Sequence, residues 1–190
     1  MASEAVAGLV LAGGLGRRHG GIDKGWLTHQ GSPLVAHALA HLQQAGCSAR
    51  LISANRNIER YASLGVTVVP DRREGFLGPL SGIESALQAC EAQWLYVLPV
   101  DVLGMPGDWL AQLYSQLEST RQPWCGTLDG SRLQPLLGLW SRELLPSLQA
   151  YLDAGGRRVM EFVRPWQTYA LALPAGTQLR NLNAPESLQP

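Results

Sequence analysis

Lysine is nearly missing from this chain of 190 residues. Lys24 is the single lysine among fifteen Lys and Arg residues, and fifteen Asp and Glu residues bring the formal net charge to zero. A chain with no surplus of positive charge has no broad basic field to hold a phosphate backbone, so we expect no nucleic-acid partner. Where charge is this evenly balanced, a lysine inside a glycine-dense stretch suggests a local task for that one side chain.

Cysteines and long apolar runs are scarce as well. Cys47, Cys90 and Cys125 have no metal-binding or paired spacing, which argues against a disulfide framework or a zinc ribbon. The apolar run at residues 5–12 is too short for a signal peptide. No stretch approaches the roughly 20 apolar residues that a membrane span needs. We therefore expect a cytoplasmic protein with no membrane partner, folded as one domain over residues 1–190.

Apolar runs and helical spacing alternate along the first part of the chain. The patterns predict strands at residues 5–11, 50–54, 66–69 and 94–98, and helices at residues 34–45, 58–64, 80–89 and 107–116. This alternation is typical of an α/β fold with three layers, in which helices cover both faces of an open, mostly parallel sheet.

The rhythm changes in the second part of the chain. Two strands are predicted at residues 123–128 and 133–140, around an Asp129-Gly130 turn, and they are followed by helices at 142–154 and 158–162 and a strand at 168–173. A strand pair joined by Asp-Gly is a hairpin signal. We expect these elements to complete the domain and to cover one side of it.

A glycine-rich loop follows the first strand. Residues 13–21 hold five glycines in nine positions, and Arg17, Arg18 and Lys24 add positive charge. Glycine lets the backbone approach a ligand, and successive N–H groups can form an anion-binding nest. The spacing fits neither a Walker A loop nor a dinucleotide fingerprint. Asp71 and Asp101 follow the third and fourth predicted strands, so a di- or triphosphate site is expected where three strand ends converge.

The loop resembles the signature of the molybdenum cofactor guanylyltransferases, the MobA family, within the wider nucleotidyltransferases. The matching residues are Leu11-Ala12-Gly13-Gly14, Arg17-Arg18, Gly20-Gly21 and Asp23-Lys24. The resemblance continues at Asn55-Arg56, Asp71, Gly78-Pro79-Leu80-x-Gly82, Pro99-x-Asp101, Gly156-Arg157-Arg158-Val159-Met160 and Asn181-x-Asn183-x-Pro185-Glu186. It implies a Rossmann-like sheet of the nucleotide-diphospho-sugar transferase type and the transfer of GMP from GTP to molybdopterin, with release of pyrophosphate.

The resemblance also implies roles for single residues. Lys24, with Arg17 or Arg18, would offset the charge on the leaving pyrophosphate. Asp101 would bind Mg²⁺, which also touches the phosphates, although an Asp near a strand end can instead cap a helix. Asp71 would bind the nucleoside part of GTP, and the backbone N–H groups of residues 12–14 would face the nucleotide. The nucleotide-binding set is Leu11, Ala12, Gly13, Gly14, Lys24, Ser53, Asp71, Gly78 and Asp101.

The acceptor side is expected in the second half of the chain. Residues 1–115 would form the nucleotide-binding half and residues 116–190 the acceptor-binding half. Arginines suit the phosphate of the acceptor and amides suit the edges of its pterin ring, while solvation or helix capping would explain the same residues without a ligand. The candidates are Arg157, Arg158, Asn181 and Asn183. The family further implies contact with other proteins of cofactor synthesis.

A few positions distinguish this chain from enzymes of related function. The resemblance implies that an alanine in place of Gly13 is typical of the cytidylyl form of these enzymes, so Gly13 favours GTP over CTP. Sugar-phosphate nucleotidyltransferases are usually longer chains, and a non-catalytic nucleotide-binding adaptor would have lost Lys24 or Asp101.

His37 and His41 have the spacing of a metal pair but no evident third ligand, so we expect them on a solvated helix face.

Overall fold

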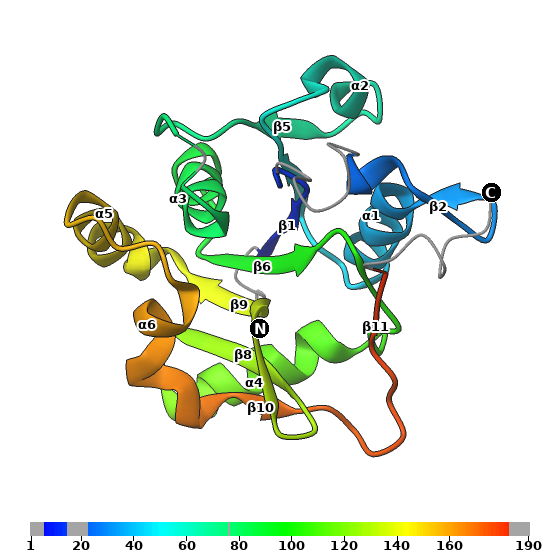
Figure 1. The fold of residues 1–190 in the computed structure, drawn as a ribbon. Helices are drawn as coiled ribbons and strands as arrows, with labels where there is room; N and C mark the ends of the chain where they lie inside the picture. The colour runs from blue at the N-terminus through cyan, green and yellow to red at the C-terminus, as the bar shows by residue number, and fades with distance from the viewer. Residues whose placement is uncertain (1–5, 15–22, 76, 183–190) are drawn as a thin grey trace.

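The computed structural model describes residues 6–14, 23–75 and 77–182, and it is built on a seven-stranded sheet with the order β10-β8-β9-β6-β1-β4-β5 (Figure 1). β1 pairs in parallel with β4 and β6, whereas β9 is antiparallel to both β6 and β8. The expectation of a mostly parallel sheet is confirmed. The strands of this sheet are β1 (Val6–Leu11), β4 (Ala49–Ser53), β5 (Thr67–Val69), β6 (Trp94–Pro99), β8 (Trp124–Asp129), β9 (Arg132–Ser141) and β10 (Leu171–Ala172).

Helices cover both faces of the sheet, as expected for three layers. α1 and α4 pack on one face, and α3, α5 and α6 pack on the other. In the described ranges, no helix combines the length and apolar character needed to cross a bilayer. The α-helices are α1 (Leu34–Gln44), α2 (Ile58–Ala62), α3 (Pro79–Ala89), α4 (Trp109–Thr120), α5 (Leu145–Asp153) and α6 (Val159–Val163), and the 3-10 turns are η2 (Lys24–Trp26), η3 (Arg142–Leu144) and η4 (Arg164–Tyr169).

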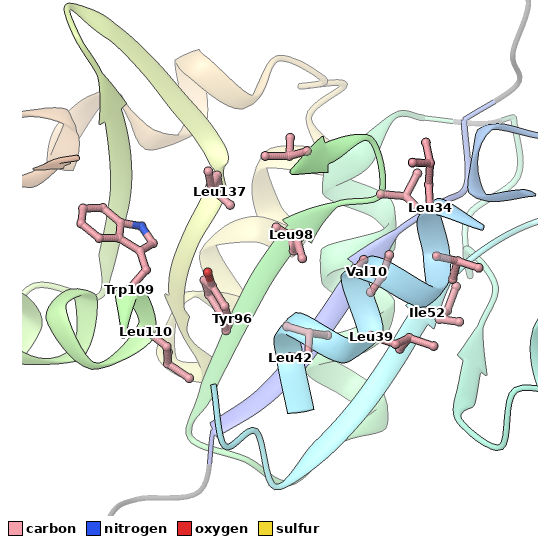
Figure 2. Packing of buried hydrophobic residues seen from close by; sticks show 14 of the residues in the cluster. Val10, Leu34, Leu39, Leu42, Ile52, Tyr96, Leu98, Trp109, Leu110 and Leu137 are labelled. Atoms are coloured by element: carbon pink, nitrogen blue, oxygen red, sulfur yellow. The ribbon is translucent and has the colours of Figure 1, made fainter. Parts of the chain in front are cut away.

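The core under α1 and α4 is shown in Figure 2. Val10 of β1 and Leu98 of β6 lie against α1, and Trp109 of α4 is fully buried farther along the same face. The Trp109 indole N–H donates a hydrogen bond of 2.9 Å to the Thr127 hydroxyl, so its polar atom is paired inside the core. Strands buried on both faces lack the polar alternation of a half-exposed sheet, which is why β1 and β6 read as apolar runs.

Three predicted elements differ from the observed ones by more than two residues at one end or in kind. The helix expected at residues 107–116 begins at Trp109 and continues to Thr120, where Arg121 adopts a left-handed conformation with φ of 54°. The helix expected at 142–154 is divided into η3 and α5, with a proline in the first turn of α5. The strand expected at 168–173 shrinks to β10, because the preceding residues form η4. Proline suits a first helical turn, where its missing N–H costs nothing.

Two short antiparallel ribbons had no sequence signal. β2 (Thr28–His29) pairs with β3 (Ser32–Pro33), and β7 (Val102–Leu103) pairs with β11 (Arg180–Asn181). In the second ribbon the Leu182 N–H donates 2.9 Å to the carbonyl oxygen of Asp101. The end of the described chain is thereby held against the segment that leaves β6. Strands of two residues are too short to show a periodicity.

Candidate functional site

The carboxyl ends of β1, β4, β5 and β6 meet at one edge of the sheet, where an open α/β fold binds its ligands. Lys24 opens η2 near this edge, and Asp101 follows β6. The Lys24 Nζ atom lies 3.0 Å from Oδ2 of Asp101, across 77 residues of sequence. Both side chains keep some access to solvent, at 27% and 19% exposure. The structure therefore brings the expected phosphate-binding cation and the expected metal ligand into direct contact.

Asp23 anchors the segment that carries Lys24. Its carboxylate accepts hydrogen bonds from the Gly25 N–H at 3.2 Å, the Asn57 side-chain amide at 2.8 Å and the Tyr61 hydroxyl at 2.6 Å. Tyr61 is fully buried, and burial together with the bond to Asp23 raises the pKa of its hydroxyl. Three donors on one carboxylate fix the residue next to Lys24 against α2, so they also set the starting point of the lysine side chain.

A cavity of about 270 Å³ adjoins the sheet edge. Six of the residues predicted to bind the nucleotide line it: Leu11, Gly13, Gly14, Ser53, Asp71 and Gly78. Asn55, Pro79, Pro99 and Leu136 complete the wall. Leu136 belongs to the second half of the chain, because antiparallel β9 lies beside β6. No local sequence pattern indicates that Leu136 reaches this cavity.

Asp71 and Asn55 form a reciprocal pair in the wall of this cavity. The Asn55 side-chain amide Nδ2 donates a hydrogen bond of 2.8 Å to Oδ2 of Asp71, and the Asp71 backbone N–H donates one of 2.7 Å to the side-chain Oδ1 of Asn55. Burial raises the pKa of Asp71, the hydrogen bond from Asn55 lowers it, and the charge of Glu84 raises it further. The pair locks both side chains in place. Asn55 is not among the residues that the sequence predicts to bind the nucleotide. Its place in the family motif at Asn55-Arg56 was the sequence feature that could have identified it as the partner of Asp71.

The backbone at the end of β1 differs from one expectation. The Ala12 N–H donates a hydrogen bond of 2.9 Å to the carbonyl oxygen of Ser53, so this N–H is already paired at the edge of the sheet and does not face a nucleotide. This hydrogen bond comes directly after the last pair of the β1–β4 register, Leu11 with Ser53. Gly13 and Gly14 line the cavity, and the Gly14 carbonyl accepts a hydrogen bond of 3.1 Å from the Arg56 guanidinium.

Arg73 braces the loop that carries Asp71. Its guanidinium donates to both carboxylate oxygens of Glu84, at 2.7 and 2.8 Å, and to Asp153 at 2.6 Å. Glu84 is 3% exposed, so this bidentate pair supplies the charge partner that a buried carboxylate requires. The loop after β5 is thus tied to α3 and α5 together.

The acceptor candidates divide into two places. Arg157 donates to the carbonyl oxygens of Leu152 at 2.8 Å and Gly156 at 2.6 Å, and Arg158 is paired with Glu161 at 2.9 Å. Both arginines therefore hold contacts around the connection between α5 and α6, and their binding of an acceptor stays a prediction. Asn181 instead sits in β11, opposite the residue that follows Asp101. Arg17, Arg18 and Asn183 lie outside the described residues.

The donor set suits a metal that is shared with a substrate. Across residues 6–14, 23–75 and 77–182, no group of three or more His, Cys, Asp or Glu side chains could enclose a metal ion. Asp101 would supply one hard carboxylate ligand. Mg²⁺ in nucleotide enzymes is commonly held by one or two carboxylates together with substrate phosphates and water. The residues present fit Mg²⁺ bound in this way.

The expectation that His37 and His41 form a solvated face is wrong. Both are half-buried, and both border a second cavity. Nε2 of His37 lies 2.9 Å from the His29 carbonyl oxygen, and Nε2 of His41 lies 3.1 Å from the Tyr96 hydroxyl. Burial lowers the pKa of His41. The two ribbons cover a helix face that would otherwise meet water.

Comparison with known sequences gives a consistent result. Residues 8–169 match the MobA-like NTP transferase domain. The molybdenum cofactor guanylyltransferase of Shewanella sediminis is 40% identical over 151 residues, which cover 80% of this chain and 76% of that protein. The molybdenum cofactor guanylyltransferase of Shewanella halifaxensis is 35% identical over 186 residues, covering 97% and 92%.

Solved structures share the fold at low sequence identity. Molybdopterin-guanine dinucleotide biosynthesis protein A from Archaeoglobus fulgidus has a TM-score of 0.69 at 20% identity, with 88% of this chain and 83% of that chain covered. CTP:phosphocholine cytidylyltransferase from Streptococcus pneumoniae also has a TM-score of 0.69, at 13% identity and 96% coverage of both chains. At these identities the likeness establishes the three-layer fold.

Proposed function

We propose how this chain, which belongs to the MobA-like NTP transferase family, carries out the reaction of a molybdenum cofactor guanylyltransferase. The reaction transfers GMP from GTP to molybdopterin and releases pyrophosphate. The observation that carries the proposal is the 3.0 Å contact between Lys24 and Asp101, at the sheet edge where the nucleotide cavity opens. A cation for phosphate and a carboxylate for a metal are the two charges that phosphoryl transfer requires.

The cavity of about 270 Å³ is assigned to the nucleoside of GTP. Asp71, held by Asn55, offers a carboxylate of fixed orientation in a partly desolvated wall. A fixed polar group in such a wall discriminates well, because a ligand without the matching donor leaves it unpaired. All the residues that line this cavity, apart from Leu136, belong to residues 1–115. This supports the division into a nucleotide-binding half and an acceptor-binding half over residues 116–190.

The chemical step proceeds in line. A phosphate oxygen of molybdopterin attacks the α-phosphorus of GTP, the bond from that phosphorus to the bridging oxygen breaks, and pyrophosphate leaves with the electron pair. The Lys24 ammonium, fixed through Asp23, would neutralise charge as it develops on the leaving group. Mg²⁺ on Asp101, when bound, supplies further neutralisation of the phosphates. Arg17 and Arg18 are proposed to assist Lys24.

The two charged groups exchange partners when substrate binds. Without nucleotide, Lys24 and Asp101 compensate each other in a half-buried position. A triphosphate gives Lys24 an anionic partner, and a metal gives Asp101 a cationic one. Neither charge is left buried and unpaired at any stage, which avoids the large penalty of an isolated charge.

The test uses purified protein with GTP, Mg²⁺ and molybdopterin. Pyrophosphate release and the mass of a guanylated pterin are measured. Lys24→Met and Asp101→Asn are each expected to lower kcat by about 10²- to 10³-fold, whereas Asp108→Asn, at an exposed carboxylate that precedes α4, leaves it unchanged. Removing Mg²⁺ with a chelator should stop turnover. Faster turnover with CTP or with a sugar phosphate acceptor would overturn the assignment. The cytosolic location and contact with other cofactor-synthesis proteins stay predictions.

A further inference from the structure

A second cavity, of about 430 Å³, lies between α1 and the β7–β11 ribbon, and we refer to it as the histidine cavity. Apolar side chains of β6 and β7 form part of its wall, and Figure 2 shows Leu98 of β6 beside α1. Its polar lining consists of His29, Gln30, His37, His41, Gln178 and Arg180. None of these side chains has a role in the nucleotide site described above.

The β7–β11 ribbon connects the histidine cavity to the reaction centre. β7 begins directly after Asp101, with Asn181 paired to Val102 and Arg180 paired to Leu103. The Asp101 carbonyl oxygen accepts the Leu182 N–H at 2.9 Å. Val102, the residue directly after Asp101, already lines the cavity, and a strand advances about 3.3 Å per residue, so the cavity wall begins next to Asp101 along the chain. The β7–β11 ribbon thus borders both Asp101 and the histidine cavity.

We propose that the histidine cavity receives the pterin ring of the acceptor, whose phosphate reaches the Lys24–Asp101 pair. This proposal rests on the proposed function and assigns its acceptor site. A pterin has flat apolar faces and edges that carry both donors and acceptors. The apolar wall suits the faces, and imidazole and amide groups suit the edges because they donate and accept hydrogen bonds. Arg180 adds positive charge for an anionic ligand.

The lining chemistry favours an organic ligand over a metal ion. The histidines of this cavity are not grouped as metal ligands anywhere in the described ranges. His37 and His41 already use one ring nitrogen each, toward a backbone carbonyl and toward Tyr96. Such contacts fix the imidazole rings, so the walls are preorganised for a ligand of definite shape.

The arginines expected on the acceptor side provide a rival location. Arg157 is held by two backbone carbonyls, and Arg158 by Glu161. Arg132 and Arg180 are both exposed arginines, one at the start of β9 and one on the ribbon. They form a matched pair of positions, since the same substitution can be made at each.

The first experiment compares Arg180→Gln with Arg132→Gln by steady-state pyrophosphate release. Arg180→Gln is expected to raise KM for molybdopterin about tenfold, the loss of one charged hydrogen bond, with KM for GTP unchanged. Arg132→Gln is expected to leave both constants unchanged. An unchanged molybdopterin KM in Arg180→Gln, or an equal rise in Arg132→Gln, would overturn the proposal.

The second experiment separates the acceptor site from the reaction. Equilibrium binding of a fluorescent pterin monophosphate is measured without nucleotide, and binding of GTP with Mg²⁺ is measured by calorimetry. Gln178→Trp, at an exposed lining position, is expected to weaken pterin binding at least tenfold and to leave GTP binding intact. Pterin binding that depends on Gln178 and Arg180 supports the site even in a protein that fails to guanylate molybdopterin. Pterin binding that is indifferent to both substitutions refutes it.

Discussion

Replacing Tyr61 with phenylalanine tests whether the anchor at Asp23 positions Lys24. The Tyr61 ring is fully buried, so Phe keeps the packing and removes only the hydroxyl that donates 2.6 Å to Asp23. A hydrogen bond to a charged group contributes about 1.5–3 kcal/mol. Asp23 is half-buried and keeps the Gly25 N–H and Asn57 as donors. We therefore expect the low end, a loss of about 1.5 kcal/mol in the free energy of unfolding.

Catalysis should fall along with stability in Tyr61→Phe. If about 1 kcal/mol of the lost anchoring had served to hold Lys24 in place, kcat would drop about fivefold, while KM for GTP would change less. Urea unfolding gives the stability, and pyrophosphate release at saturating GTP and molybdopterin gives kcat. Tyr151→Phe is the matched control, because its hydroxyl also bonds a carboxylate, that of Glu161, but on α5 and away from Lys24.

Two results would refute this reasoning. Tyr61→Phe with the expected loss of stability and a native kcat would show that the anchor supports the fold without positioning the lysine. An equal fall of kcat in Tyr151→Phe would show that the assay responds to hydroxyl loss in general. A further check is Asp23→Asn, which keeps the size of the side chain but weakens all three bonds, and which should lower kcat more than Tyr61→Phe does.

Three other positions yield predictions of a different kind. Gly82→Ala should cost about 1–3 kcal/mol in urea unfolding and raise KM for GTP, because the added Cβ would collide with the Ser53 hydroxyl in the cavity wall. Burial raises the pKa of Asp71 above its unfolded value, so its contribution to stability is present in acid and lost as pH rises through the folded pKa. The difference in free energy of unfolding between Asp71→Asn and the native protein should therefore shift in favour of Asp71→Asn as pH rises from about 3 to about 7. A difference that does not change with pH would contradict this. Gly13→Ala should fold normally, since its Cβ would lie 3.4 Å from the Asn55 amide, and should raise the ratio of CTP to GTP turnover; an unchanged ratio would remove Gly13 as a determinant of base preference.

The sheet and the convergence of strand ends could be predicted because both depend on local patterns. β1, β4, β5 and β6 are short buried runs, and the three-layer arrangement follows from their alternation with helices. The same rule placed Asp71 and Asp101 at one edge. The family motif then singled out Lys24, which the structure finds in contact with Asp101.

The parts that could not be predicted depend on contacts between distant segments. The bond from Tyr61 to Asp23 spans 38 residues, and no periodicity links the two positions. Leu136 reaches the nucleotide cavity only because β9 is antiparallel to its neighbours. His37 and His41 were misjudged because a helical pattern shows which face is polar, but not what later covers that face.

The interior position of β1, between β6 and β4, affects how the protein folds during synthesis. β1 is the first of these strands to be synthesised, yet its partners β4 and β6 begin at Ala49 and Trp94, and β9 ends at Ser141. At about 5–20 residues per second, most of the chain must emerge before this sheet can close. The contact between Lys24 and Asp101 therefore forms late during translation. GTP cannot guide the early steps of folding, and it can stabilise only a chain whose sheet is already assembled.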